Sequence, residues 1–348
     1  MIPAKGYAAH HAKDRLNPWN FERREPGEKD VQLEIVYCGV CHSDIHQVRS
    51  EWGPAKYPMV PGHEIVGRVT KTGNGVKKFK PGDLVGIGCM VDSCGECDNC
   101  RHGWEQYCQN GMTIWTYNSF EKDGKTLTFG GYSNFIVADE SFILKVPENL
   151  PLEGVAPLLC AGITTFSPLR KWKVGKGHKV GILGLGGLGH MGVKFAASFG
   201  AEVTMLSTSP SKEADARRLG AHNFCYTKDE NQVAAYKNYF DFILDTVSAP
   251  HDYNMYLKML GTNGVMICVG VPPAPMMINA SLLLGNSRSL TGSNIGGIPE
   301  TQEMLDYCGK HGIVSDVEVI NINYINEAYE RVIGSDVKYR FVIDMATL

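Results

Sequence analysis

The sequence predicts an α/β protein with two domains, an irregular β-barrel and a doubly wound parallel sheet. The length of 348 residues is roughly twice that of a typical domain of ~150 residues. Short β-prone runs broken by Gly and Pro extend to about residue 155, and strands alternate with helical patterns from there to about residue 295. We therefore expect one domain over residues 1–155 and 296–348, and a second over residues 156–295.

The first domain is predicted from short strand patterns. Residues 31–37 alternate roughly as a half-buried strand does, and residues 65–69 and 84–87 are further β-prone runs. Pro-Gly turns at 61–62 and 81–82 separate them. This pattern favours a barrel whose loops carry function.

The second domain is predicted from a change of period. Strand patterns occur at residues 180–183, 202–206, 242–244 and 265–269, with helical spacing at 188–199 and a polar helix at 211–219. Such alternation is typical of a parallel sheet covered by helices on both faces. A helical stretch at 300–311 and β-prone runs at 317–320 and 339–343 follow. We interpret this tail as a return to the first domain.

Composition excludes several classes of protein. Hydrophobic residues make up 43% and charged residues 20%, which is typical of a globular chain. The net charge of −3 argues against a nucleic-acid or acidic-membrane binder. No apolar run approaches the ~20 residues of a membrane span, and the N-terminus has no signal-peptide core. We expect a soluble, cytoplasmic protein in which the 11 cysteines serve metal or catalytic roles rather than disulfides.

A glycine loop at residues 184–189 indicates a nucleotide cofactor. Its residues match G-x-G-x-x-G between a predicted strand and a predicted helix: Gly184, Leu185, Gly186, Gly187, Leu188 and Gly189. The glycines allow a tight turn and close approach of a pyrophosphate to the helix N-terminus. The alternative is an ordinary glycine-rich turn.

The end of the next strand distinguishes between cofactors. NAD enzymes usually place an acidic residue there, whereas this chain has Ser207, Thr208, Ser209 and then Lys212. The hydroxyls and the positive charge suit the 2′-phosphate of NADP(H), and charge-assisted hydrogen bonds worth ~1.5–3 kcal/mol would favour NADP over NAD roughly ten- to hundred-fold. Alternatively, Ser209 is a helix N-cap and Lys212 is merely solvated; both interpretations can hold together.

Two groups of residues could hold zinc. Cys94, Cys97, Cys100 and Cys108 fall in one short loop and match a closed, structural four-thiolate site, with an iron–sulfur cluster as the rival. Cys41, His63 and Cys160 are dispersed but suit a catalytic zinc, which takes three protein ligands and one exchangeable position. Taken singly, Cys160 could instead be a core thiol and His63 an ordinary loop histidine.

Several motifs occur together and in order. They are Cys41-His42-Ser43-Asp44, Gly62-His63-Glu64, the four-cysteine loop, the run 160–164 and the glycine loop. Together they resemble the zinc-containing medium-chain alcohol dehydrogenases, and within them the cinnamyl alcohol dehydrogenase branch with its bacterial NADP-dependent aldehyde reductases. The likeness covers nearly the whole chain, including residues 296–303 and 338–344.

The resemblance implies the fold and the activity. It implies a GroES-like barrel domain, a Rossmann domain, and hydride transfer between NADP(H) and alcohols or aldehydes with two Zn²⁺ per chain, one catalytic and one structural. It also implies a homodimer joined through an edge strand, for which residues 265–269 and 282–284 are candidates unless they are internal core.

The resemblance also implies roles for individual residues. Cys41, His63 and Cys160 match catalytic zinc ligands, Glu64 a transient fourth ligand, Asp44 the partner of the ligand histidine, and Ser43 with His46 a proton relay in which Ser43 also meets the cofactor. Residues matching contacts of the nicotinamide half are Thr164, Thr246, Gly270, Ser293, Asn294 and Ile295.

Trp115, Trp52 and Cys89 are candidates for the substrate pocket, although either Trp could simply be core. Asn294 stands where phenylpropanoid-specific plant enzymes carry a large aromatic residue, so we expect broad reduction of aromatic and aliphatic aldehydes. Two rivals stay open: an NAD-linked polyol or short-alcohol dehydrogenase of the same fold, and a non-catalytic zinc- and cofactor-binding sensor.

Overall fold

The computed structural model describes residues 1–348 and divides them into two units, Met1–Ile163 with Gly296–Leu348, and Thr164–Ile295. The sequence predicts the first domain boundary after residue 155, eight positions before the observed boundary after Ile163. The later break arises because the 3-10 helix Ala156–Leu159 packs on strands of the first unit. The strand and helix pattern of the sequence therefore changes one short helix earlier than the boundary between the two units.

The first unit is mostly β. Its strands are β1 (Ile2–Ala8), β2 (Asn17–Arg23), β3 (Asp30–Val40), β4 (Ile65–Thr72), β5 (Leu84–Ile87), β6 (Met90–Asp92), β7 (Ile114–Trp115), β8 (Phe135–Asp139), β9 (Leu144–Lys145), β16 (Val317–Asn321) and β17 (Arg340–Asp344). Its helices are α1 (His42–Val48), α2 (Asp98–Arg101), α3 (Leu152–Val155), α10 (Ile298–His311) and α11 (Ile325–Ile333).

A seven-stranded sheet organises this unit. Its order is β16-β17-β3-β4-β5-β9, with β8 pairing with β3 off that path, while β1-β2 and β6-β7 form two-stranded sheets. The alternation predicted for residues 31–37 is realised in β3, where Val31, Leu33 and Ile35 are buried. The C-terminal tail returns to this unit because β17 pairs antiparallel with β3, Phe341 opposite Val40.

The second unit is a doubly wound parallel sheet. Its strands are β10 (Lys179–Leu183), β11 (Glu202–Ser207), β12 (Asn223–Tyr226), β13 (Phe240–Asp245), β14 (Leu260–Cys268) and β15 (Ser289–Gly292). Its helices are α5 (Gly187–Ser198), α6 (Glu213–Arg218), α7 (Glu230–Ala235), α8 (Tyr253–Met259) and α9 (Ala280–Leu284), and α4 (Ala161–Lys171) leads into it.

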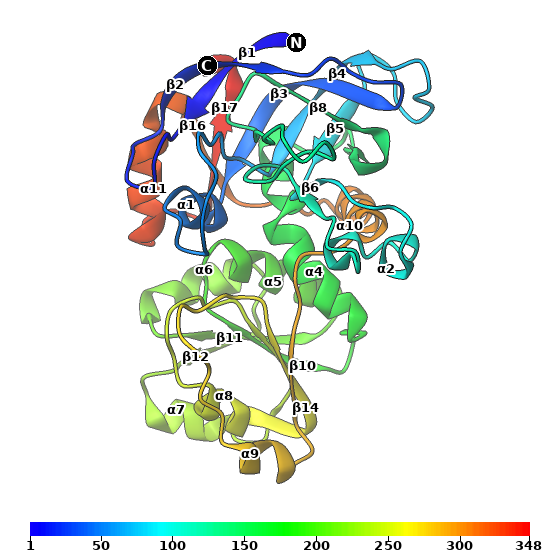
Figure 1. Ribbon diagram of the computed structural model, residues 1–348. Helices are drawn as coiled ribbons and strands as arrows, with labels where there is room; N and C mark the ends of the chain where they lie inside the picture. The colour runs from blue at the N-terminus through cyan, green and yellow to red at the C-terminus, as the bar shows by residue number, and fades with distance from the viewer. The chain divides into compact units, whose positions relative to one another are not determined.

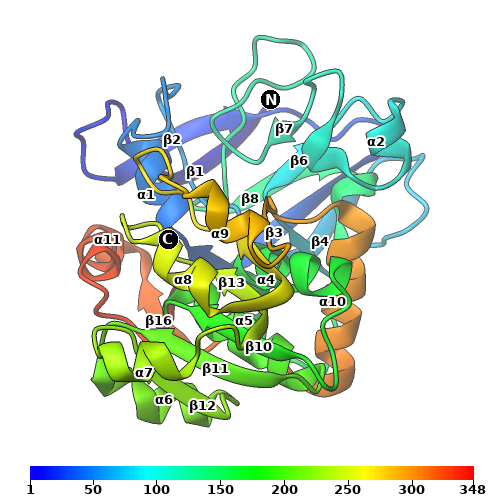
Figure 2. The ribbon, with the colours of Figure 1, turned by 90° about the horizontal axis from the view of Figure 1, so that it is seen from below.

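All six strands are parallel, in the order β12-β11-β10-β13-β14-β15. Figure 2 shows the succession from β12 through β11 and β10 to β13. Helices α5 and α6 cover one face and α7 and α8 the other (Figure 1). This is the strand order of a dinucleotide-binding sheet, whose ligands lie at the carboxyl ends of the strands.

Two details of the second unit refine the sequence-based prediction. The helix predicted at 211–219 is a 3-10 turn, Pro210–Lys212, followed by α6. Of the two interpretations of residues 265–269, apolar edge or internal core, the structure supports the second, because residues 265–268 belong to β14, an interior strand between β13 and β15. The edge strand beside β14 is the short β15, whose sequence Ser-Leu-Thr-Gly does not by itself predict a strand.

No single helix is long and apolar enough to cross a membrane, and only the bent pair Leu152–Leu159 with Ala161–Lys171 passes by length and composition together.

Candidate metal centres and cofactor loop

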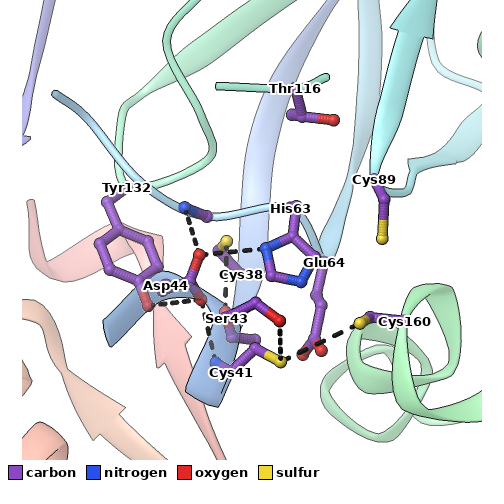
Figure 3. A network of polar contacts seen from close by, with 12 residues as sticks. Cys38, Cys41, Ser43, Asp44, His63, Glu64, Cys89, Thr116, Tyr132 and Cys160 are labelled. Atoms are coloured by element: carbon purple, nitrogen blue, oxygen red, sulfur yellow. Dashed lines mark hydrogen bonds and ion pairs between the residues drawn. The ribbon is translucent and has the colours of Figure 1, made fainter. Parts of the chain in front are cut away.

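A cluster of four buried side chains brings together residues far apart in the sequence. Cys41 precedes α1, His63 and Glu64 directly precede β4, and Cys160 directly precedes α4. One possible ligand atom from each lies within 4.8 Å of all the others. Figure 3 shows the four side chains converging on one point.

The spacing of this cluster fits zinc. The Sγ atoms of Cys41 and Cys160 are 4.0 Å apart. Two sulfurs at ~2.3 Å from a tetrahedral ion are about 3.8 Å apart, whereas a disulfide needs about 2.05 Å. Glu64 Oε2 is buried without a partner, which also suits a cation beside it. The residues therefore fit a zinc ion held by two thiolates and an imidazole.

Asp44 hydrogen-bonds to Cys41 and His63 and so fixes the positions of these two predicted ligands. Its fully buried carboxylate accepts from Cys41 N at 2.9 Å, Gly62 N at 3.0 Å, His63 Nδ1 at 3.0 Å and Tyr132 Oη at 3.2 Å. Since Nδ1 of His63 is engaged with a carboxylate, the Nε2 lone pair is left for a metal. The bond to Cys41 N also fixes the first turn of α1.

The electrostatics of the cluster follow from burial and neighbouring charges. Burial would lower the pKa of His63, but Asp44 raises it well above its usual value. The hydrogen bond from Cys160 lowers the pKa of the Cys41 thiol, and Arg340 and His63 lower it further. A thiol that gives up its proton readily suits metal ligation.

Arg340 forms a buried ion pair with Glu64. Its Nη2 donates to Glu64 Oε1, and both side chains are almost without solvent contact. Burial raises the pKa of Glu64 to about 7, although Arg340 opposes that shift. The role of Arg340, which begins β17, was not predicted from the sequence.

The predicted relay residues lie on α1. Ser43 Oγ accepts from Cys41 Sγ at 3.6 Å, while His46 Nδ1 lies 2.5 Å from Glu51 Oε2. The Trp52 ring stacks on His46 with 4.7 Å between ring centroids. Glu51 was missed by the sequence reasoning, since its spacing from His46 carries no helical signal. With Glu51 on Nδ1, Nε2 is the nitrogen of His46 free to exchange a proton.

The three candidate pocket residues differ in position. Cys89 lies beside the cluster, with Sγ 3.9 Å from Leu159 O (Figure 3). Trp115 is in β7 and 37% exposed, and Trp52 is 45% exposed. Neither Trp is core, so the alternative of simple core packing does not hold for them.

The four-cysteine loop forms a second centre. The ligand sulfurs of Cys94, Cys97, Cys100 and Cys108 lie within 4.8 Å of one another. Cys94 and Cys100 are 3.7 Å apart and Cys97 and Cys108 4.0 Å, again near the tetrahedral spacing of about 3.8 Å. A backbone N–H from Cys100 and another from Gln109 lower the pKa of Cys97 to about 6. The Cys97 thiol therefore gives up its proton readily, as a zinc ligand must, whereas burial raises the pKa of Cys100 to about 12.

In the second unit, the glycine loop joins β10 to α5. Gly184 has φ +88°, a conformation that favours glycine. A Cβ on Gly189 would overlap the carbonyl of Gly184, while one on Gly186 would meet nothing within 4 Å. The N-terminus of α5 is thus open at the carboxyl edge of the sheet, as an anion site requires.

The serine-rich segment follows β11 at the same edge. Ser207 is buried and its Oγ accepts from Ser209 N at 3.1 Å. Ser209 is the N-cap of the 3-10 turn but makes no side-chain cap bond; its Oγ lies 2.9 Å from Ser211 Oγ. Thr208 is exposed. No acidic residue occupies positions 207–212.

The other predicted cofactor residues lie in several elements. Thr164 is buried in α4, and Thr246 Oγ1 donates to Leu183 O at 2.7 Å. A Cβ on Gly270 would overlap the backbone of Val247, so glycine is required there. Ser293 to Ile295 follow β15, with Asn294 between them.

Comparisons with known proteins agree on one family. The model "Alcohol dehydrogenase GroES-like domain" matches residues 27–148 and "Zinc-binding dehydrogenase" matches residues 187–310. NADP-dependent alcohol dehydrogenase C 1 of Mycolicibacterium smegmatis is 53% identical over 348 residues, covering 100% of this chain and 99% of that protein. Aldehyde reductase YahK of Escherichia coli is 53% identical over 347 residues, covering 99% of both.

Solved structures agree with these matches. A cinnamyl alcohol dehydrogenase from Sorghum bicolor has a TM-score of 0.96 at 44% identity, covering 99% of this chain and 98% of that one. One from Helicobacter pylori complexed with NADP(H) has a TM-score of 0.93 at 43% identity, covering 99% of both. The resemblance and the fold class predicted from the sequence are confirmed.

Proposed function

The chain belongs to the cinnamyl alcohol dehydrogenase branch of the zinc-containing medium-chain alcohol dehydrogenases, and on that premise we propose that it reduces a broad range of aldehydes, aromatic ones included. It is an NADP-dependent zinc alcohol dehydrogenase, as the named relatives at 53% identity over the full length support. The observation that carries the proposal is the convergence of Cys41, His63 and Cys160 with an orphaned Glu64 oxygen.

Zinc supplies a Lewis acid that polarises a carbonyl and stabilises negative charge on its oxygen, and NADPH supplies the hydride. We assign the catalytic ion to Cys41, His63 and Cys160, and a second, structural ion to the four-cysteine loop. Asp44 fixes the His63 tautomer. Arg340 holds Glu64 by Oε1, and Oε2 is left without a hydrogen-bond partner.

Protons are handled by residues of α1 and the turn after it. Ser43 Oγ donates its proton to the former carbonyl oxygen of the aldehyde, which becomes the hydroxyl group of the product alcohol. His46 Nε2 resupplies it, while Glu51 holds the proton on Nδ1. The His46 side chain is itself 25% exposed, so solvent can restore its proton. Oxidation of an alcohol uses the same groups in reverse.

The preference for NADP over NAD is assigned to Ser207 through Lys212. Hydroxyl groups and an ammonium follow β11, where an acidic residue would repel the 2′-phosphate. Initial rates with NADPH and NADH at equal concentration and benzaldehyde as substrate test this assignment. A strong NADPH preference supports it, and equal rates or an NADH preference would favour the NAD-linked polyol or short-alcohol alternative.

We assign the broad range of accepted aldehydes to the candidate residues of the substrate pocket. Asn294 replaces a large aromatic side chain, and Trp115, Trp52 and Cys89 supply apolar surface and a thiol. Comparable kcat/KM for benzaldehyde, cinnamaldehyde and a linear aldehyde would support this assignment. A hundredfold or greater preference for one of them would contradict it.

A homodimer is the proposed assembly. The edge strand β15 has a free side, and nearby apolar side chains are exposed, Met277 by 84% and Leu284 by 82%. We expect light scattering to give twice the chain mass and Leu284→Glu to give the monomer. A cytoplasmic location is also proposed, because all eleven cysteines are free and zinc thiolates need a reducing compartment.

A further inference from the structure

We propose that His251 is a positioning residue for the cofactor: as an imidazolium it pairs with the buried Asp245 and so holds the loop that supports the cofactor-binding edge of the second unit. This inference rests on the proposed assignment of Gly184 and Gly270 to the cofactor site. It concerns groups outside both metal centres, joined by contacts within one unit.

One hydrogen bond and one close carboxylate determine the charge of His251. Its Nδ1 lies 2.9 Å from Ala249 O, and its Nε2 lies 3.2 Å from Asp245 Oδ2. A carbonyl and a carboxylate oxygen both only accept, whereas a neutral imidazole carries a proton on one nitrogen alone. With its Nδ1 proton on Ala249 O, a neutral ring would turn the Nε2 lone pair toward the carboxylate at 3.2 Å, whereas the doubly protonated ring gives Asp245 a positive partner.

Asp245 needs this counter-charge. It is the last residue of β13 and its side chain is 2% exposed. Its Oδ1 accepts from Val247 N at 3.0 Å, but no Lys or Arg pairs with it. An isolated buried carboxylate is costly, so the pair with His251 holds the loop from residue 246 to 252 against the end of the strand.

That loop supports the glycine loop directly. Thr246 Oγ1 donates to Leu183 O at 2.7 Å and to Gly184 O at 3.1 Å. Val247 packs so closely that a Cβ on Gly184 would lie 2.7 Å from its Cγ2. A shift of the loop would therefore displace the first glycine of the pyrophosphate turn.

The same loop also supports the segment after β14. Gly270 N donates to Asp245 O at 3.2 Å, and its Cα lies against the backbone of Val247. Val271 N donates to Ser248 Oγ at 3.3 Å. The ion pair between His251 and Asp245 thus supports both Gly184 and Gly270, two predicted cofactor contacts that are far apart in the sequence.

The groups around His251 come from several elements. Tyr253 and Tyr256 of α8 face its ring, with centroids 4.2 and 5.8 Å away, Cys268 of β14 neighbours Asp245, and Asp252 is adjacent in sequence. Burial raises the pKa of Tyr253 and of Cys268 to about 12.

The sign of the pH dependence follows from the pKa of His251. Burial would lower that pKa, but Asp245 raises it above 6.5 overall. A raised pKa means that the pair is intact below 6.5 and is lost as pH rises through the raised value. Cofactor affinity should therefore fall as the solution becomes more alkaline.

The experiment measures NADPH dissociation constants by nucleotide fluorescence with the full-length, zinc-loaded protein between about pH 6.5 and pH 9.5. His251→Gln should weaken NADPH binding roughly tenfold at the acidic end and converge with the wild type at the alkaline end. The kcat at saturating NADPH should be nearly unchanged. His251→Arg, which keeps a cation, should retain affinity and lose the pH dependence, and Asp245→Asn should lose it as well.

His178→Gln is the matched control. His178 lies in the same unit but directly before β10, at the amino end of the strands, where its Nδ1 accepts from Gly175 N at 3.1 Å. This variant should follow the wild-type profile.

Three outcomes would overturn the proposal. An unchanged profile in His251→Gln would refute it while leaving the cofactor site intact. An equal loss of affinity at every pH, with a lower melting temperature, would show a merely structural role. Failure of the wild type to bind NADPH at any pH would instead refute the proposed cofactor site, and this inference with it.

Discussion

Asp44→Asn tests whether the Asp44 carboxylate, which hydrogen-bonds to Cys41 and His63, strengthens binding of the catalytic zinc ion. In the wild type each carboxylate oxygen accepts two bonds: Oδ1 from Gly62 N and His63 Nδ1, and Oδ2 from Cys41 N and Tyr132 Oη. An amide can present only one oxygen. In either orientation its NH₂ group faces two former donors.

The magnitude follows from those two unsatisfied donors. Leaving a buried donor unpaired costs about 1–3 kcal/mol, so the substitution should destabilise the site by about 2–6 kcal/mol, less any relief when Tyr132 turns its hydroxyl. Loss of such a ligand-orienting partner typically weakens metal binding or activity ~10–100-fold. We expect a weakening in this range for the catalytic ion alone.

The assay follows zinc transfer to a coloured chelator. Asp44→Asn should release one zinc per chain faster than the wild type, while the four-cysteine site keeps its ion as an internal reference. Asp123→Asn is the matched control, because Asp123 also accepts from two backbone N–H groups, of Lys125 and Thr126, but is exposed. Equal release rates from Asp44→Asn and the wild type would refute the reasoning.

Three further predictions concern single side chains. Cys41→Ser should abolish turnover and halve the zinc content from two ions per chain to one; a variant with wild-type rates would show that the ligand assignment is wrong. Lys212→Ala should raise the KM for NADPH about tenfold and leave that for NADH unchanged, because a charged partner of the phosphate is lost; parallel changes for both would argue against a 2′-phosphate contact. Glu51→Gln should lower kcat about tenfold with zinc content and KM unchanged, because the proton on His46 Nδ1 loses its ionised acceptor. An unaltered kcat and pH–rate profile would remove Glu51 from the relay.

Much of the site could be predicted from local sequence. The glycine loop and the four-cysteine loop are each contiguous, so their residue spacing limits the backbone geometry directly. Gly184 requires a positive φ, and the four sulfurs fall within fifteen positions of the chain. Strand β3 could likewise be predicted from the sequence, since alternation of period two shows which side chains face a core.

The tertiary structure decided what depends on contacts between distant segments. Arg340 meets Glu64 across 276 positions, and Cys160 meets Cys41 across 119. The sequence named Cys41 and Cys160 as ligands through resemblance, but it did not indicate that Arg340 would be their neighbour. The edge of the parallel sheet stayed open for the same reason: an apolar run such as residues 265–269 indicates that a strand is buried and not which strands lie beside it. Local spacing restricts a few neighbouring dihedral angles, whereas the pairing of remote strands is fixed by burial and hydrogen bonding over the whole chain, and only the folded structure shows which pairing results.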